Sequence, residues 1–248
     1  MSQSELALID VGGRSIAYRL REGNVPTIIF LPGYASDMDG TKALALDDFA
    51  ERRGLSMLRL DYSGTGSSGG RFEEGTLALW LEEALAALDR LTQGPLVVIG
   101  SSMGGWIALH LALLRPDRVR ALVGIAAAPD FTDWGFTPEQ KARLDGGGRL
   151  EELNPYGPEP QIVTGAFWKS GQQLRLLDDE IAIDCPVRLI HGERDEEVPL
   201  AVALRLMRVL RSSDVQLKVL KNAGHRLSEA HEIDAILRTV DGLLETRA

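Results

Sequence analysis

The sequence contains one cysteine, Cys185, and only four histidines in 248 residues. A single cysteine excludes an intrachain disulfide, which suits a protein of a reducing compartment. The histidines show no metal-site clustering, so we expect neither a bound metal nor a cofactor. No apolar run approaches the ~20 residues that a membrane-spanning helix needs. We therefore expect neither a disulfide scaffold nor a membrane span.

Positive charge is also scarce, because 27 lysines and arginines stand against 36 aspartates and glutamates, for a net charge of −9. Nucleic acids and anionic membrane surfaces attract basic proteins, so the composition argues against both as partners. Residues 1–11 lack the basic start and apolar stretch of a secretory signal, and they are not the arginine-rich segment of a transit peptide. We therefore expect a cytoplasmic protein.

What is present is an ordinary globular composition, 44% hydrophobic and 25% charged, at a length that suits one α/β domain over residues 1–248. Two strand-like runs flank Gly12-Gly13 and predict a hairpin. Beyond it, predicted strands alternate with predicted helices, which implies the α/β class with a mostly parallel central sheet and helices on both faces. The expected strands are residues 27–31, 55–60, 96–99, 119–126, 187–190 and 215–220, and the expected helices are residues 43–52, 76–91, 106–114, 200–210 and 228–244.

The alternation stops between residues 129 and 184, where no clear strand is predicted and glycine and proline interrupt short helical pieces. An insertion of this length in a compact domain favours a lid over a plain loop. We therefore expect a lid insertion at about residues 130–180, at the edge of the sheet where ligands bind.

The most informative motif is Gly100-Ser101-Ser102-Met103-Gly104, which follows an apolar strand and precedes an apolar helix. It fits G-x-S-x-G, the pattern of a nucleophile elbow. Such a turn forces the serine into sparsely populated backbone space, at a cost of about 1–3 kcal/mol, and it needs glycine on both sides. The context predicts Ser102 as a nucleophile at the start of a helix.

A serine hydroxyl needs a base and a third group that orients the base. His225 follows the predicted strand 215–220, in a loop at the strand's carboxyl end, and is the expected base. Asp195 follows the preceding strand, which yields the order Ser, Asp, His of elbow-type hydrolases. The alternatives for the acid are the neighbours Glu193, Glu196 and Glu197, and Asp130 after an earlier strand. Of the other histidines, we expect His110 to point away from the site, His231 to lie within the last helix and His191 to end a strand.

The oxyanion hole requires two backbone N–H groups, expected from Met103 and from Tyr34 in the loop Leu31-Pro32-Gly33-Tyr34-Ala35. Pro32-Gly33 could equally be an ordinary turn. The aromatic side chains Trp106, Phe131, Trp134, Phe167 and Trp168 are candidates for an apolar acyl-binding wall, although the aromatic residues of a lid equally often form its own small core.

Two other features point to no chemistry. Residues 64–69 fit G-x-G-x-x-G, but the last glycine does not open a helix, so we expect a tight loop beside the site and not a nucleotide site. Cys185 precedes Pro186 at the start of a strand and is expected to be a packed thiol.

Four stretches together resemble the mycophenolic acid acyl-glucuronide esterase family, which is also described as a palmitoyl-protein thioesterase of mitochondria. They are residues 31–34, 40–45, 61–68 and 100–106, and the similarity continues through residues 185–192 and His225-Arg226. The resemblance implies an α/β-hydrolase fold, the triad Ser102, Asp195 and His225, and hydrolysis of carboxylic esters, acyl glucuronides or S-acyl cysteines. Residues 131–177 match less well, and the transit segment of the mitochondrial members is missing, which indicates a bacterial-type cytoplasmic relative.

The sequence thus predicts a serine hydrolase that cleaves small-molecule esters or acylated proteins through an acyl-enzyme on Ser102. A serine aminopeptidase or a carbon–carbon bond hydrolase would keep the same triad. Dehalogenase or epoxide hydrolase chemistry would need a carboxylate at the elbow, and a non-catalytic binding protein would be expected to have lost a triad member. The acyl chain, the leaving group and the oligomeric state are not determined by the sequence.

Overall fold

The computed structural model describes residues 4–152 and 160–245, and its centre is a sheet in the order β1-β2-β4-β3-β5-β6-β9-β10. Strands β1 and β2 pair in antiparallel fashion with each other, β2 is antiparallel to β4, and the remaining pairs are parallel. The strands are β1 (Leu6–Val11), β2 (Arg14–Arg21), β3 (Asn24–Leu31), β4 (Leu55–Leu60), β5 (Leu96–Ser101), β6 (Val119–Ile125), β9 (Val187–Gly192) and β10 (Val215–Leu220). The predicted α/β class with a mostly parallel sheet is confirmed.

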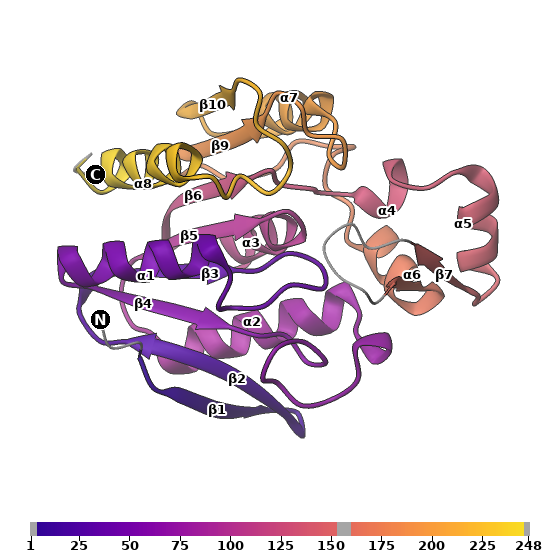
Figure 1. Cartoon of the computed structure of the whole chain (residues 1–248), viewed down its shortest axis with the longest axis horizontal. Coiled ribbons are helices and arrows are strands. Elements are labelled where there is room, and N and C mark those ends of the chain that lie inside the picture. The colour runs from indigo at the N-terminus through magenta and orange to yellow at the C-terminus, as the bar shows by residue number, and fades with distance from the viewer. Residues whose placement is uncertain (1–3, 153–159, 246–248) are drawn as a thin grey trace.

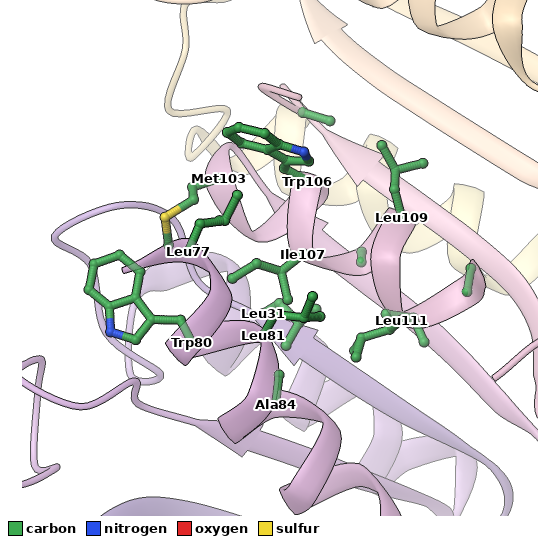
Figure 2. Close-up of a cluster of buried hydrophobic side chains, with 14 of the residues drawn as sticks. Leu31, Leu77, Trp80, Leu81, Ala84, Met103, Trp106, Ile107, Leu109 and Leu111 are labelled. Carbon is green, nitrogen blue, oxygen red and sulfur yellow. The ribbon is translucent and has the colours of Figure 1, made fainter. Parts of the chain in front are cut away.

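Helices cover both faces of this sheet because each buried strand alternates its side chains between two cores. On β5, Val97 packs into one core with α1 (Thr41–Arg53) and α8 (Ala230–Glu245). Its neighbour Val98 packs into the other core with α2 (Leu77–Leu91), α3 (Met103–Leu114) and α7 (Leu200–Val209). Figure 2 shows Leu81 of α2 beside Ile107 of α3 in this second core. Burial on both faces explains the continuous apolar runs of the parallel strands.

The hairpin around Gly12-Gly13 is present, with φ of 60° and 82° at the two glycines. Positive φ at both central residues is the requirement of a type I′ turn, which glycine meets without strain. The predicted strands and helices are all found, with ends that differ by a few residues. The largest differences follow from the turns that flank them: β3 begins three residues earlier, and α3 begins directly after Ser102.

The insertion between β6 and β9 contains α4 (Phe131–Trp134), α5 (Pro138–Asp145), α6 (Gly165–Gln173) and two strands, β7 (Arg149–Glu152) and β8 (Gln161–Thr164). The expectation of no strand here was wrong. The two strands are four residues long and pair only with each other, so neither is long enough for its alternation to stand out in the sequence. In Figure 1 these elements gather at the right, at the end of the molecule toward which the parallel strands point.

The insertion, called the lid below, is tied to the sheet at its end by buried polar contacts. The Asp130 carboxylate, just after β6, accepts hydrogen bonds from the Leu176 and Leu177 N–H groups at 2.7 to 3.0 Å. The Leu174 carbonyl accepts from Trp106 Nε1 at 3.0 Å and from His110 Nε2 at 2.9 Å, both on α3. The helix that follows Ser102 therefore also holds the chain that returns from the lid.

Candidate active site

Ser102 lies in the turn between β5 and α3 with φ 53° and ψ −119°, a conformation that costs a non-glycine residue about 1–3 kcal/mol. Its neighbours hold it there through its main chain. The Ser102 N–H donates to the Ile125 carbonyl at 2.9 Å, and the Ser102 carbonyl accepts from the Gly105 and Ala128 N–H groups at 2.9 and 3.1 Å. The strained elbow predicted from the motif is therefore present and supported from β6.

The two glycines of the motif are needed for different reasons. A Cβ on Gly100 would collide with the carbonyl of Gly104, as expected for a turn that folds back on itself. A Cβ on Gly104 would instead collide with the carbonyl of Leu31, at the end of β3. Gly104 thus lets the neighbouring strand approach α3, a contact that the motif alone does not reveal.

His225 and Asp195 meet Ser102 at the carboxyl ends of their strands, although the three residues are far apart in the sequence. His225 Nε2 lies 3.1 Å from Ser102 Oγ, and His225 Nδ1 lies 2.9 Å from Asp195 Oδ2. Because a carboxylate only accepts, Nδ1 carries the proton and Nε2 is free to accept one from Ser102. The three side chains predicted from the sequence are brought together in the order required for a serine nucleophile.

The Asp195 carboxylate is fully buried and fixed from several sides. Its Oδ1 accepts from the Glu197 and Val198 N–H groups at 3.0 and 2.8 Å, so the other oxygen is held toward His225. Burial alone would raise the pKa of Asp195, but the hydrogen bond and charge of His225 and the Val198 N–H outweigh it, and the pKa lies below its ordinary value. Asp195 is therefore ionised at neutral pH.

Most of the other candidates for acid and base have different partners, whereas Glu197 lies in the site, with its Oε2 3.7 Å from His225 Nε2 and not at Nδ1. Asp130 binds the lid's returning chain, as described above, and Glu193 accepts from the Asn222 N–H at 3.0 Å. His110 contacts the Leu174 carbonyl, and His231 is exposed at the start of α8. His191 is buried beside Asp195, where its Nε2 lies 2.9 Å from the Val198 carbonyl.

The two amides that the sequence proposes for the oxyanion hole, those of Tyr34 and Met103, both lie next to Ser102 along the chain or in space. The main chain of Gly33 passes so close to Ser102 that a Cβ at residue 33 would lie 3.3 Å from the Ser102 Cβ, and the next amide is that of Tyr34. The Met103 N–H is the first of α3 and cannot bond within the helix. Neither amide donates to another group in residues 4–152 or 160–245.

The Tyr34 side chain contacts the lid. Its hydroxyl donates to the Ile162 carbonyl of β8 at 2.5 Å, and its ring lies 4.7 Å from that of Phe167 and 6.0 Å from that of Phe131. Burial raises the pKa of Tyr34, so the hydroxyl stays protonated and can serve as a donor. The loop that carries one candidate oxyanion amide is thus fastened to the lid.

A cavity of about 590 Å³ opens over Ser102 and His225. The lid side of its lining consists of Phe131, Trp134, Gly135, Phe136, Gln161 and Val163. Of the five aromatic side chains that the sequence offered for an acyl-binding wall, Phe131 and Trp134 line the cavity, whereas the other three do not. Trp106 and Phe167 are buried behind the wall against Phe131, and Trp168 Nε1 donates to the Thr132 carbonyl at 2.8 Å.

Several lining residues were missed by the sequence reasoning. They include the charged residues Lys42, Arg226, Asp37 and Glu197, which differ in character from the apolar lid wall. Lys42 and Arg226 belong to stretches that carried the family resemblance, and this was the available signal for them. Phe136 had none, because a loop residue acquires its neighbours only through the fold, and Glu197 was considered only as an alternative acid.

The glycine-rich loop after β4 forms a tight turn that contacts the loop carrying Tyr34. Its Asp61 carboxylate accepts from Met38 N–H at 2.7 Å and from Ser67 N–H at 2.8 Å. Cys185 is partly buried, and burial raises the pKa of its thiol to about 11, so it is not a thiolate at neutral pH. Within the described ranges no cluster of three metal-ligating side chains occurs, and no helix has the length and hydropathy to cross a membrane.

Comparison with known proteins gives one consistent family. Residues 26–151 match the family described as alpha/beta hydrolase fold. The chain is 38% identical over 235 residues to the human mitochondrial palmitoyl-protein thioesterase ABHD10, covering 93% of this chain and 77% of that one. The structure of mouse alpha/beta hydrolase domain-containing protein 10 superposes with a TM-score of 0.91 at 35% identity, over 98% of this chain and 99% of that one. A structure from Agrobacterium vitis S4 described as a hydrolase superposes with a TM-score of 0.90 at 40% identity, with the same two coverages.

Proposed function

The chain belongs to the α/β-hydrolase family and is a serine hydrolase of esters or thioesters, and we propose that Ser102, His225 and Asp195 are its catalytic triad. The observation that carries the proposal is the continuous chain of contacts at 3.1 and 2.9 Å from the Ser102 hydroxyl through His225 to a buried carboxylate. The position of Ser102 on a strained turn, in the lining of a cavity, supports the same conclusion.

In the first half of the proposed reaction, Ser102 Oγ attacks the acyl carbonyl while His225 Nε2 takes its proton. Asp195 holds the imidazole tautomer and stabilises the imidazolium without becoming protonated. The amides of Tyr34 and Met103 donate to the oxyanion, and removing one such donor typically costs about 3–4 kcal/mol in the barrier.

In the second half, the bond between the acyl carbon and the leaving oxygen or sulfur breaks, and His225 returns its proton to that atom. Water then attacks the acyl carbon while His225 takes a proton from it. The bond between that carbon and Ser102 Oγ breaks, His225 returns the proton to Oγ, and the acyl group leaves as a carboxylic acid. The proposed chemistry needs no metal or cofactor.

For the substrate, we propose a thioester with an apolar acyl chain. The human relative is named a palmitoyl-protein thioesterase, and Phe131, Trp134 and Phe136 supply an apolar wall beside Ser102 here. Burying each additional CH₂ of an acyl chain against such a wall contributes about 0.8 kcal/mol. The cytoplasmic location stays a prediction, since that relative is named mitochondrial.

A fluorophosphonate probe tests the nucleophile, with wild type compared to Ser102→Ala. Labelling of the wild type alone supports the proposal, while no labelling of folded wild type would contradict it and favour a binding protein. A series of p-nitrophenyl acetate, butyrate and palmitate, with matching thioesters, then measures acyl-chain and ester preference. Peptide amides cleaved faster than esters would instead favour an aminopeptidase.

A further inference from the structure

The cavity over Ser102 has a cationic side as well as an apolar one, and we propose that Lys42 and Arg226 bind an anionic group on the leaving part of the substrate. The selectivity would come from a carboxylate or phosphate that remains on the alcohol or thiol after cleavage. This inference rests on the proposed function, because it assigns a role to the leaving-group side of the same site.

The position of the leaving group follows from the proton that it must receive. His225 Nε2 delivers that proton, so the leaving atom has to come within hydrogen-bond reach of this nitrogen. Arg226 is the next residue in the chain, and the Lys42 ammonium donates a hydrogen bond to the Arg226 carbonyl. The two cations are therefore attached to the part of the wall that carries His225.

The Lys42 ammonium is held by a carbonyl and has no carboxylate in direct contact within the described residues. No ion pair joins it to any acid in the described ranges 4–152 and 160–245, and its hydrogen bond is to a neutral carbonyl. Burial, and then the charge of Arg226, lowers the pKa of Lys42 to about 8, with Glu232 acting in the opposite direction. A partly buried cation beside a like charge is costly unless an anion joins it.

The backbone at this point also favours an anion. Lys42 is in the first turn of α1, whose N-cap, Gly40, has no side chain to accept from the free N–H groups. Residues 40–43 all line the cavity, so the positive end of the helix faces it together with the ammonium. The helix end adds to the two side chains and is not needed to identify the site.

Two carboxylates limit where the anion can sit. Glu197 Oε2 lies 3.7 Å from His225 Nε2, and Asp37 accepts from the Asp39 N–H at 2.9 Å. Both carboxylates line the cavity and repel an anion from the parts of its surface near them. The anionic group of the substrate is therefore bound most favourably where it contacts Lys42 while the leaving sulfur or oxygen atom stays beside His225.

The test uses pairs of thioesters that differ by one charge. S-octanoyl-N-acetylcysteine carries a carboxylate, and S-octanoyl-N-acetylcysteinamide is its neutral partner. S-octanoyl-4′-phosphopantetheine and S-octanoyl-pantetheine form a second pair, in which the anion is a more distant phosphate. The release of thiol gives kcat/KM for each, and the pair with the larger ratio identifies which anion the site takes.

The variants are Lys42→Met, Arg226→Gln and, as the matched control, Lys221→Met, which removes an exposed charge outside the cavity lining. Arg226→Gln is informative because it keeps the carbonyl that Lys42 binds. We expect the kcat/KM of the wild type to be about tenfold or more higher for the anionic member of one pair than for its neutral partner. A difference of this size corresponds to one charge-assisted hydrogen bond, which only the anionic thioester can form. That ratio should fall toward one in both cavity variants and persist in the control.

A ratio near one for wild type in both pairs would overturn the inference. So would an equal loss of rate on charged and neutral thioesters in Lys42→Met with no change of ratio in Arg226→Gln, since Lys42 would then only support the His225 loop. If folded wild type cleaves none of the four thioesters and takes no fluorophosphonate label, the proposed function itself fails. Melting curves of all variants establish that they are folded.

Discussion

The Tyr34 hydroxyl donates a 2.5 Å hydrogen bond to the Ile162 carbonyl, which joins the loop after β3 to the lid strand β8. Gly33, the residue before Tyr34, lies against Ser102, and Tyr34 lines the cavity over the serine. The residue whose backbone we propose for the oxyanion hole therefore has its side chain fixed to the lid. The position of the lid and the geometry of that amide are expected to depend on each other.

Tyr34→Phe tests this dependence. Loss of the hydroxyl leaves the Ile162 carbonyl without its donor, which should lower the free energy of unfolding by about 1 kcal/mol or slightly more. We expect kcat/KM to fall by about tenfold, below the ~100-fold that a 1 Å misplacement at a reacting centre can cost. Ester kinetics and thermal melting measure both effects.

The control for that variant is Tyr18→Phe, which removes a hydroxyl on β2 that bonds to nothing in the described residues. It should change neither quantity appreciably. Equal losses of kcat/KM and of stability in both variants would mean that the contact between Tyr34 and the lid does not support the geometry of the site.

Asp195→Asn and Asp130→Asn distinguish the two carboxylates that the sequence left as rivals. Asp195→Asn should lower kcat by about 10⁴-fold, because an amide no longer holds the required tautomer of His225. Asp130→Asn should instead lower the melting temperature, since its carboxylate binds the Leu176 and Leu177 N–H groups of the lid. We therefore expect the larger loss of kcat in Asp195→Asn and the larger loss of melting temperature in Asp130→Asn. The reverse result would make Asp130 the triad acid.

Gly104→Ala probes the close approach of β3 to α3. The new methyl group would collide with the Leu31 carbonyl, so we expect a loss of about 3 kcal/mol or more. For a chain of this size that is a fall of about 6–12 °C in melting temperature. Gly242→Ala on exposed α8 meets nothing within 4 Å and should instead stabilise by about 0.5–1 kcal/mol through helix propensity. Calorimetry of the two variants checks the contrast.

The preference for an anionic leaving group should depend on pH. The pKa of Lys42 is about 8, lowered by burial and by Arg226, so its ammonium is charged below pH 8 and neutral above it. The substrate carboxylate stays ionised throughout. The other carboxyl groups of this region are those of Asp37 and Glu197, which line the cavity, and that of Glu232, whose charge acts on Lys42. We therefore expect the ratio of kcat/KM for charged over neutral thioester to decline between pH 7 and 9.

Lys42→Arg supplies the control, because a guanidinium remains charged across that range. Its ratio should stay level between pH 7 and 9. Using a ratio cancels any ionisation of the triad, which acts on both substrates alike, and Ser102→Ala measures spontaneous hydrolysis. A wild-type ratio that does not change with pH would contradict the role of the Lys42 charge.

Local sequence was enough to predict the elbow, the order of the three side chains and nearly all strands and helices of the sheet. The reason is that each depends on neighbours in the chain: Ser102 on its glycines, and each strand on its own apolar run. The lid strands β7 and β8 escaped prediction because four-residue segments contain too little periodicity.

The sequence by itself thus determined the α/β architecture and the three residues proposed for catalysis, since chain order and strand ends place them at one edge of a parallel sheet. Only the tertiary structure decided that Asp130 holds the lid while Asp195 faces His225. It also decided that Phe167 supports the cavity wall from behind and that the cations of Lys42 and Arg226 lie together. These relationships join segments distant in the chain, and such contacts arise from packing that no local pattern encodes.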